Sequence, residues 1–413
     1  MQLERPAPLH LTYCTNIHPG DGWEEVFANL RHYAPALKER LSPGRPFGIG
    51  LRLSSRESEE LLAGDRLARF KDYLDRHGLY VFALNGFPYG SFHRQVVKSA
   101  VFAPDWREEE RVRYTLCLVE ILKRLLPEGV EGGISTTPLS YKRWIGRDTR
   151  SAWERITRNL ARIAGTLVRV QQEEGRYLHL DIEPEPDGLV ENSAELVNFY
   201  ETRLLPCGAP VLADALNVPI EQARQYLLDH VQICYDTCHM AVEYENPETA
   251  LERFARARIK VGRLQISAAL QVPLPADEGG RAPLAQQLAP FAESVYLHQV
   301  IERVADGNLR RYPDLPDALT HLQELAARQW RIHFHVPLFT ERYGPFGATQ
   351  DHIRAVFALL GRTAFTRHLE IETYTWDVLP LGLKGELLES IEREYRWVLD
   401  ALDEKDCGGV PDM

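Results

Sequence analysis

Five short β-like segments of this chain carry metal-binding or hydrogen-bonding side chains at every second position. Successive side chains of a strand point to opposite faces, so a spacing of two collects these groups on one face. Polar groups inside an apolar strand are costly to bury unless they bind a partner. The pattern therefore predicts a metal-centred pocket. The five segments are Cys234–His239, His179–Glu183, Arg263–Ser267, His333–His335 and His368–Glu372.

Three carboxylates, Glu183, Asp236 and Glu372, lie where such segments end. In an α/β barrel the ends of the strands form the catalytic rim, so these groups are the first candidates for metal binding. His239 follows Asp236 by three residues, and the two could share a cation or divide between a cation and a substrate. The alternative for Asp236 is a purely structural cap of the next helix.

Other acidic residues accompany two of these carboxylates. Glu185 and Asp187 follow Glu183, and we expect them to face solvent or to cap the next helix. Glu370 shares a face with Glu372 but lies deeper, where an inward arginine would pair with it. Two carboxylates buried without a cation shift toward the neutral acid, and a divalent ion would remove that conflict.

Two histidines at alternate positions, His333 and His335, favour coordination or substrate contact over a structural role. Gln265 could hydrogen-bond a hydroxyl or ligate weakly, but it is a poor substitute for imidazole. Arg52 lies within an apolar run and needs an anionic partner, which Glu370 or a substrate group would supply.

The elements that would carry these residues alternate between apolar strands and amphipathic helices, as in a parallel sheet covered by helices. Helices are predicted after Asp21, over 106–126, over 151–174 before Gly175, and after an N-cap at Ser193. We predict an α/β fold, a (β/α)8 TIM barrel with long loop insertions. No GxGxxG turn follows the first strand to favour a doubly wound sheet. The candidate strands are 9–16, 47–54, 79–86, 132–138, 177–184, 231–237, 259–267, 331–338 and 367–374.

These candidate strands are one more than the barrel needs. Either one lies outside it or one is not a strand, and 132–138 and 331–338 are the weakest barrel members. We assign 1–405 to a single barrel domain. It carries an insertion at about 271–330 and a lid loop at about 86–105, next to Asn85, a candidate substrate contact. Residues 406–413 are expected to be a disordered tail.

Charge, cysteine content and hydrophobicity exclude some classes of partner and location. The 413 residues include 48 basic and 59 acidic residues, a formal charge of −11, with no dense basic run, so we expect no nucleic-acid partner. Six cysteines, without CxxC pairs or a disulfide framework, suit a reducing compartment. We expect a soluble cytoplasmic protein without direct membrane insertion, since no signal-like or spanning apolar run is present.

The sequence resembles the xylose isomerase-like TIM-barrel superfamily of sugar isomerases and epimerases. That resemblance rests on Glu183, the Asp236-x-x-His239 step and Glu372. More closely, and over almost the whole chain, it resembles EboE-type metabolite-traffic proteins. The closer resemblance rests on Thr12–Gly20, Asn85–Gly90 and Glu370–Trp376.

The resemblance implies that Glu183, Asp236 and Glu372 bind a divalent ion (Mn, Mg, Zn or Fe). It also implies that Glu183 and Glu372 move a proton on either side of a carbon next to a carbonyl. The superfamily's fourth ligand is a histidine where this chain has Gln265. His333 or His335 would supply the imidazole instead, or the site binds its ion poorly; we assign His335 to the metal. The expected substrate contacts are His239, Gln265, Arg52, Asn85 and His333.

These observations leave three functions open. The first is a metal-dependent isomerase or epimerase that acts on a small polar metabolite in a metabolite-traffic pathway. The second is a non-catalytic protein that carries the metabolite to membrane-bound partners, which Gln265 and the EboE-type resemblance favour. A phosphodiesterase on damaged DNA ranks third, because Asn85 and Ser135–Thr137 stand where endonuclease relatives carry histidines.

Overall fold

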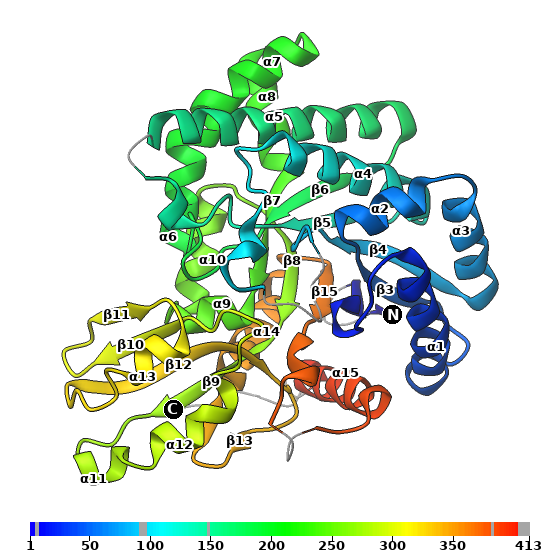
Figure 1. Ribbon diagram of the computed structural model, residues 1–413. Coiled ribbons are helices and arrows are strands. Elements are labelled where there is room, and N and C mark those ends of the chain that lie inside the picture. Colours follow the sequence, from blue (N-terminus) through cyan, green and yellow to red (C-terminus); the bar gives the residue numbers. More distant parts are fainter. Residues whose placement is uncertain (5–7, 91–96, 147–148, 381–383, 404–413) are drawn as a thin grey trace, which may run out of the picture.

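The structure is a computed structural model that describes residues 1–4, 8–90, 97–146, 149–380 and 384–403 (Figure 1). Its main sheet has nine strands in the order β1-β2-β15-β8-β7-β6-β5-β4-β3. All of them run parallel except β1, which pairs antiparallel with β2 at one edge. These strands are β1 Gln2–Leu3, β2 Leu9–Tyr13, β3 Phe47–Arg52, β4 Leu79–Asn85, β5 Gly132–Thr136, β6 Leu178–Ile182, β7 Val231–Asp236, β8 Val261–Ile266 and β15 His368–Ile371.

The parallel strands close into a barrel. A parallel bridge between Cys14 and Gly50 joins the end of β2 to β3, the two edges of the parallel set. Most of these strands are buried on both faces, as the apolar run of β4 illustrates, because helices cover the outside and side chains fill the inside. The predicted TIM-barrel fold is confirmed.

The additional candidate strand is 331–338. It is part of β12 Ala327–Val336, which lies outside the barrel, whereas the equally weak run 132–138 contains the barrel strand β5. β12 belongs to a second, six-stranded sheet of order β11-β10-β12-β9-β14-β13. The remaining strands of this sheet are β9 Ala268–Pro273, β10 Val300–Val304, β11 Leu309–Tyr312, β13 Arg342–Tyr343 and β14 Phe346–Ala348.

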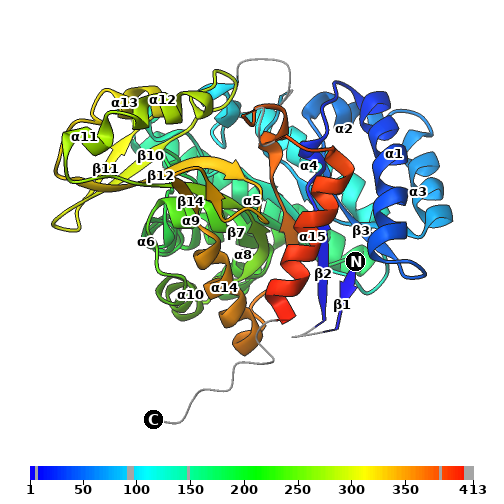
Figure 2. The same ribbon diagram turned by 90° about the horizontal axis from the view of Figure 1, so that it is seen from below.

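This inserted sheet, β9 to β14, occupies the connection between β8 and α14, and the expected insertion at 271–330 lies within it. In Figures 1 and 2 it projects from the side of the barrel opposite α1 and α3. The register of β12 against β9 shifts between Ile332 and Val336: Ile332 pairs with Leu270 and Val336 with Ala268. Such an irregularity re-aims side chains, and His333 and His335 lie within it.

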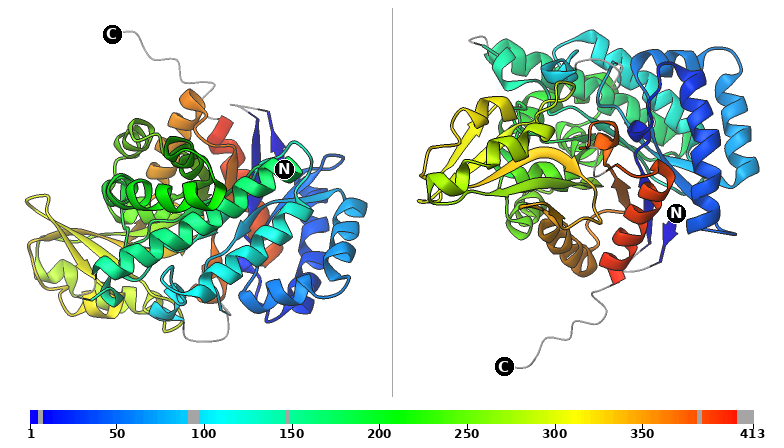
Figure 3. Two further views of the ribbon diagram at one scale, coloured as in Figure 1. Left: turned by 90° about the horizontal axis from the view of Figure 1, so that it is seen from above. Right: turned by 60° about the horizontal axis from the view of Figure 1, so that its bottom comes forward.

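Helices form a ring outside the barrel (Figures 1 and 3). The predicted helix at 151–174 is α5, and Gly175 follows it with a φ of +68°, a conformation that favours glycine. The N-cap predicted at Ser193 is wrong by one residue: the Asn192 side chain accepts from the Glu195 N–H. Ser193 instead begins the helix, and its hydroxyl accepts from Arg253.

The helix predicted over 106–126 is α4, which begins only at Glu109 because a turn at 106–107 precedes it. The α-helices are α1 Trp23–Leu41, α2 Ser55–Leu62, α3 Arg66–His77, α4 Glu109–Leu125, α5 Thr149–Glu174, α6 Ser193–Phe199, α7 Ala209–Leu216, α8 Ile220–His230, α9 Thr237–Val242, α10 Pro247–Arg256, α11 Glu278–Arg281, α12 Leu284–Leu288, α13 Leu315–Leu319, α14 Gln350–Thr363 and α15 Leu387–Asp403. The short 3-10 helices are η1 Thr15–Ile17, η2 Lys98–Phe102, η3 Lys142–Trp144, η5 Ala289–Phe291 and η6 Tyr374–Asp377, and η4 Tyr200–Gly208 is π-helical. Among the helices of the described residues, we find none long and apolar enough to cross a membrane. The tail at 406–413 lies outside the described residues.

Candidate metal centre at the carboxyl end of the barrel

Three buried carboxylates meet where β6, β7 and β15 end. Glu183 and Glu372 directly follow β6 and β15, and Asp236 is the last residue of β7. Parallel strands bring their carboxyl ends to one edge, which explains why residues so distant in sequence meet. One ligand oxygen from each lies within 4.8 Å of the others. We call these three residues the carboxylate site.

The Asp236 carboxylate is held in place through one of its two oxygens. Oδ1 of Asp236 accepts from the Ser267 hydroxyl (2.7 Å) and from the His239 N–H (2.9 Å), so Asp236 also caps α9. Oδ2 of Asp236 and Oε2 of Glu183 are buried without a hydrogen-bond partner among the described residues. Asp236 can therefore serve both roles: its Oδ1 caps α9, and its Oδ2 is left to bind a cation.

Glu372 is held from the opposite side of the pocket. Its Oε1 accepts from Asn16 Nδ2 (2.7 Å) and from Asn85 Nδ2 (3.2 Å). Gln265 lies beside this carboxylate, but its Nε2 is buried without a hydrogen-bond partner among the described residues. One of the predicted substrate contacts, Asn85, thus orients a predicted metal ligand.

Burial makes this cluster of charges costly. Burial first, and then the neighbouring Glu372 and Asp236, raise the pKa of Glu183 well above its ordinary value. The same effects raise the pKa of Glu372 to about 8. Carboxylates this close cannot all ionise without a compensating positive charge, and a divalent cation provides one.

His335 contributes an imidazole from the inserted sheet rather than from a barrel strand. Its Nδ1 donates to the backbone oxygen of Glu372 (2.7 Å), and its Nε2 is buried with no partner among the described residues. Burial lowers the pKa of His335 to about 4, so the ring is neutral and Nε2 carries a lone pair. Ligand atoms of His335, Asp236 and His239 also lie within 4.8 Å of one another.

The donor atoms fit a divalent cation. Carboxylate oxygens and a neutral imidazole with its other nitrogen hydrogen-bonded are usual ligands of Mn²⁺, Fe²⁺ and Zn²⁺. Orphaned atoms on Glu183, Asp236 and His335 are costly without a partner. The structure thus brings the four predicted metal ligands to one region, although His335 reaches it from outside the barrel.

A small cavity lies over these residues. Its volume is about 50 Å³, room for one or two water-sized groups. Phe87, Pro88 and Val101 cover it from the predicted lid at 86–105, of which residues 91–96 lie outside the described residues. The cavity is lined by Asn16, Asn85, Phe87, Pro88, Val101, Glu183, Glu185, His239, His333, His335, Glu372 and Tyr374.

Glu185 differs from its prediction. It was expected to face solvent or to cap a helix, but it is only 5% exposed and lines the cavity beside His333. The inserted sheet is the reason, because Gln299 and His333 from that sheet pack over the turn after β6. The spacing of two between Glu183 and Glu185 could have predicted that both side chains point inward. We had assumed that the alternation of faces stops where the strand ends.

Arg52 is placed differently from Asn85, His239 and His333, the predicted substrate contacts that line the cavity. Its guanidinium pairs with Glu57 (3.4 Å) and donates to the backbone oxygens of Pro88 and Gly90. It does not line the cavity. Arg52 therefore anchors the lid, and its anionic partner is Glu57 rather than Glu370.

A second polar layer fills the barrel below the carboxylate site. Arg263, fully buried, pairs with Glu370 (2.6 Å) and donates to the backbone oxygens of Leu84 and Gly133. His179 and Asp181 lie beside it, 2.6 Å apart. The inward arginine expected for Glu370 is thus Arg263.

Glycines make room for this layer. A Cβ on Gly50 would lie 2.0 Å from Glu370 Oε1, and one on Gly262 would lie 2.1 Å from Asp181 Oδ1. Real side chains do not approach so closely, so the charged layer depends on the missing side chains of the facing strands.

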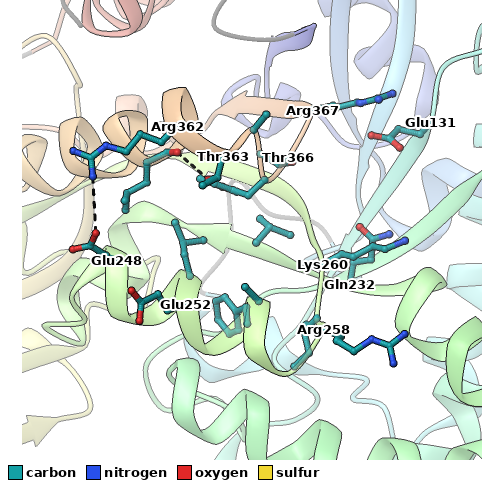
Figure 4. Close-up of a pocket in the computed structure, with 18 of the residues that line it drawn as sticks. Glu131, Gln232, Glu248, Glu252, Arg258, Lys260, Arg362, Thr363, Thr366 and Arg367 are labelled. Carbon is teal, nitrogen blue, oxygen red and sulfur yellow. Dashed lines mark hydrogen bonds and ion pairs between the residues drawn. The ribbon is translucent and has the colours of Figure 1, made fainter.

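A larger cavity, of about 660 Å³, opens at the opposite end of the barrel between α10 and α14 (Figure 4). Two of its charged residues are already paired: Arg362 lies 3.9 Å from Glu248, and Lys260 lies 2.6 Å from Asp229. This is the amino-terminal end of the strands, where barrels carry stability rather than catalysis. We therefore place the functional site at the smaller cavity.

No family model matches the sequence, and no curated protein matches it. Among solved structures, the chain is similar to an IolI protein with a bound zinc atom (14% identity, TM-score 0.44, covering 96% of this chain and 99% of that one). It is also similar to a D-tagatose 3-epimerase-like protein (9%, 0.47, 97% and 100%) and to the probable 3-DHS dehydratase AsbF from Bacillus anthracis (11%, 0.41, 95% and 98%). Likeness at such identities does not extend to what a protein binds or catalyses. The EboE-type resemblance stays a prediction.

Proposed function

We propose that this protein is a divalent-metal-dependent enzyme of the isomerase or epimerase type that moves a proton on a small polar metabolite. The convergence of Glu183, Asp236 and Glu372 carries this proposal, because their ligand oxygens lie within 4.8 Å in a buried site. Two of these residues have a buried oxygen without a partner among the described residues. A cation would satisfy both oxygens and offset the negative charge.

Glu183, Asp236, Glu372 and His335 would hold the ion. When bound, a divalent ion such as Mn²⁺, Mg²⁺, Zn²⁺ or Fe²⁺ supplies Lewis acidity that polarises a substrate carbonyl. Asn16 and Asn85 orient the Glu372 carboxylate through its Oε1. Ser267 and the start of α9 orient Asp236.

Glu183 and Glu372 would move the proton. They lie at the ends of β6 and β15, with β7 and β8 between them, so they can flank a substrate carbon. Burial and the neighbouring Asp236 raise the pKa of Glu372 to about 8 in the cation-free protein, and a bound cation would lower that pKa, so the carboxylate would be ionised and able to accept a proton.

Substrate entry requires the lid to move. The cavity of about 50 Å³ holds little more than an ion and a water molecule. A sugar-sized ligand fits only if Phe87 and Val101 withdraw, and Arg52 controls that loop through Pro88 and Gly90. Asn85, His239 and His333 would then face the ligand from the cavity wall, whereas Gln265 lies beside Glu372 and does not line the cavity.

A carrier function is the second candidate. Gln265, a weak ligand in a position where the superfamily resemblance predicts histidine, and the narrow cavity both favour binding over turnover. On the sequence resemblance alone, we also propose a role in a cytoplasmic metabolite-traffic pathway with membrane-bound partners.

Metal content tests the carboxylate site. The wild-type protein, Glu183→Gln and Asp236→Asn would be purified without chelator and measured by inductively coupled plasma mass spectrometry. We expect the wild type to hold a divalent metal that both variants lose. Glu302→Gln is the matched control, because Glu302 is also fully buried but lies in the inserted sheet and accepts from Trp330. A folded, metal-free wild type that takes up no metal on dialysis would refute the proposal.

A turnover assay distinguishes an enzyme from a non-catalytic carrier. The metal-loaded protein would be incubated in deuterium oxide with a panel of aldoses and ketoses, and NMR would follow exchange at the carbon next to the carbonyl. We expect exchange with the wild type and a loss of at least about 100-fold in Glu183→Gln and Glu372→Gln, the usual contribution of a general base. Binding without exchange of any panel member would favour the carrier.

A further inference from the structure

A second group of metal-binding side chains forms another wall of the same cavity. Glu185, from the turn after β6, meets His239 of α9 and His333 of β12, and one ligand atom from each lies within 4.8 Å of the others. All three residues are at most 5% exposed. We call this group the histidine site. It shares no residue with the carboxylate site.

The hydrogen bonds of the two imidazoles fix their tautomers. His239 Nδ1 lies 3.0 Å from the backbone oxygen of Pro184, which can only accept, so Nδ1 carries the proton. His333 Nδ1 lies 2.7 Å from Gln299 Oε1. The Gln299 amide cannot be reversed, because its Nε2 donates to the backbone oxygen of Pro186 (2.9 Å). His333 Nδ1 is therefore also protonated.

Both rings consequently turn a lone pair toward each other. The two Nε2 atoms are 3.1 Å apart, and because Nδ1 carries the ring proton in both imidazoles, each Nε2 of the neutral rings presents a lone pair. Two facing lone pairs repel unless a cation lies between them. Metal-binding histidines show this arrangement, with the remote N–H tied to a carbonyl or an amide oxygen.

The spacing agrees with shared coordination. Two imidazole nitrogens at about 2.0–2.1 Å from one zinc ion are roughly 3.3 Å apart at a tetrahedral angle and roughly 2.9 Å apart at a right angle. The observed 3.1 Å lies between these values. The geometry fits a tetrahedral or more highly coordinated divalent ion.

Glu185 supplies the negative charge that such an ion needs. Its Oε2 is buried without a hydrogen-bond partner among the described residues. Together, Glu183, Glu185, Asp236 and Glu372 place four carboxylates around one small cavity, and one divalent ion balances only half of that charge.

We propose that His239, His333 and Glu185 bind a second divalent transition-metal ion, so that the cavity is a two-metal centre. Imidazole nitrogens favour borderline ions such as Zn²⁺, Co²⁺ or Fe²⁺, whereas the oxygen-rich carboxylate site also suits Mn²⁺ and Mg²⁺. His239 and His333 would then act as metal ligands rather than as direct substrate contacts. This inference goes beyond the proposed function and does not depend on it.

Metal stoichiometry tests the proposal. Metal-free protein would be dialysed against Zn²⁺ and then against metal-free buffer, and bound zinc would be measured per chain. We expect two equivalents in the wild type, one in His333→Asn, one in His239→Asn and one in Glu183→Gln. In the Co²⁺-loaded protein, His333→Asn should remove the intense visible bands of a four-coordinate ion and leave the weaker bands of the oxygen-rich site.

His230→Gln is the matched control. His230 is fully buried, but both of its ring nitrogens have protein partners, Leu178 and Gln171, at the amino-terminal end of β7. This variant should retain two equivalents. Circular dichroism of the metal-free proteins checks folding, and Glu185→Gln replaces any histidine variant that does not fold.

The possible results distinguish failure of the histidine site from failure of the carboxylate site. A wild type with one equivalent, removed by Glu183→Gln but not by His333→Asn, overturns the histidine site and leaves the proposed function intact. One equivalent removed only by His333→Asn overturns the carboxylate site instead. If the wild type binds one equivalent and both variants lose it, the two groups of residues share a single ion. If His333→Asn, His239→Asn and Glu185→Gln all keep two equivalents, the second ion is bound by other residues. Either result refutes the histidine site.

Discussion

Replacing Arg263 with methionine tests whether the buried ion pair beneath the carboxylate site is needed for stability. Arg263 and Glu370 are both fully buried, with Nη1 and Oε2 2.6 Å apart. The Glu370 carboxylate keeps Arg263 protonated by raising its pKa against the effect of burial. Methionine retains most of the side-chain length but leaves the carboxylate without its cation.

The expected loss follows from that orphaned charge. Removing one partner of a buried pair costs about 3–5 kcal/mol, and here the bonds to the backbone oxygens of Leu84 and Gly133 are lost as well. Adding Glu370→Leu to the variant should recover part of this loss. We expect a coupling energy of about 0.5–3 kcal/mol, because the two groups interact directly.

Urea unfolding followed by circular dichroism measures these differences at pH 8. Arg162→Met is the control, since Arg162 forms a bidentate ion pair with Glu109 at the surface. Loss of this pair should reduce the free energy of unfolding by less than about 1 kcal/mol. Burial raises the pKa of Glu370, so the cost of Arg263→Met should shrink as the pH falls. A cost below about 1 kcal/mol at pH 8, or strict additivity in the double variant, would refute the reasoning.

Three further predictions concern packing, pH and helix capping. Gly262→Ala should destabilise by about 1–3 kcal/mol or more, because its Cβ would lie 2.1 Å from Asp181, whereas Gly347→Ala, with nothing within 4 Å, should be nearly neutral in thermal unfolding. Burial raises the pKa of Glu372 to about 8, so the folded metal-free protein holds a proton that the unfolded chain has released above about pH 4.5. Stability should therefore fall as the pH rises from about 4.5 to about 8, by up to about 1.4 kcal/mol per pH unit; urea unfolding of the metal-free protein should show a shallower fall in Glu372→Gln, and equal slopes would contradict the assignment. Asn192→Ala should cost about 1 kcal/mol in the same assay through loss of the α6 cap, and Ser193→Ala less than that.

Much of the barrel could be predicted from local patterns. The strands that became β2 to β8 and β15 are apolar runs separated by helical segments, and burial on both faces leaves that pattern in the sequence. Helix α5 was predictable from its spacing and from Gly175. The cap at Asn192 was missed because Asn and Ser are nearly equal as N-caps, and backbone geometry chooses between them.

The inserted sheet was harder to predict, because strand propensity does not reveal which sheet a strand joins. The run 331–338 looked like a ninth barrel strand, but antiparallel pairing with β9 and β10 holds it outside the barrel. Its register shift turns His333 and His335 toward the cavity. Pairing between distant strands has no local signal, so the source of these imidazoles was open.

The sequence by itself determined which groups could do chemistry: Glu183, Asp236 and Glu372 were recognisable as polar residues at the ends of apolar strands. Only the tertiary structure decided which of them meet and what else joins them. Glu185 looked solvent-exposed until the inserted sheet covered it, and His335 reaches the site from outside the barrel. The physical reason is that alternation along a strand defines the face of a side chain, whereas burial and proximity depend on elements that pack against it from far along the chain.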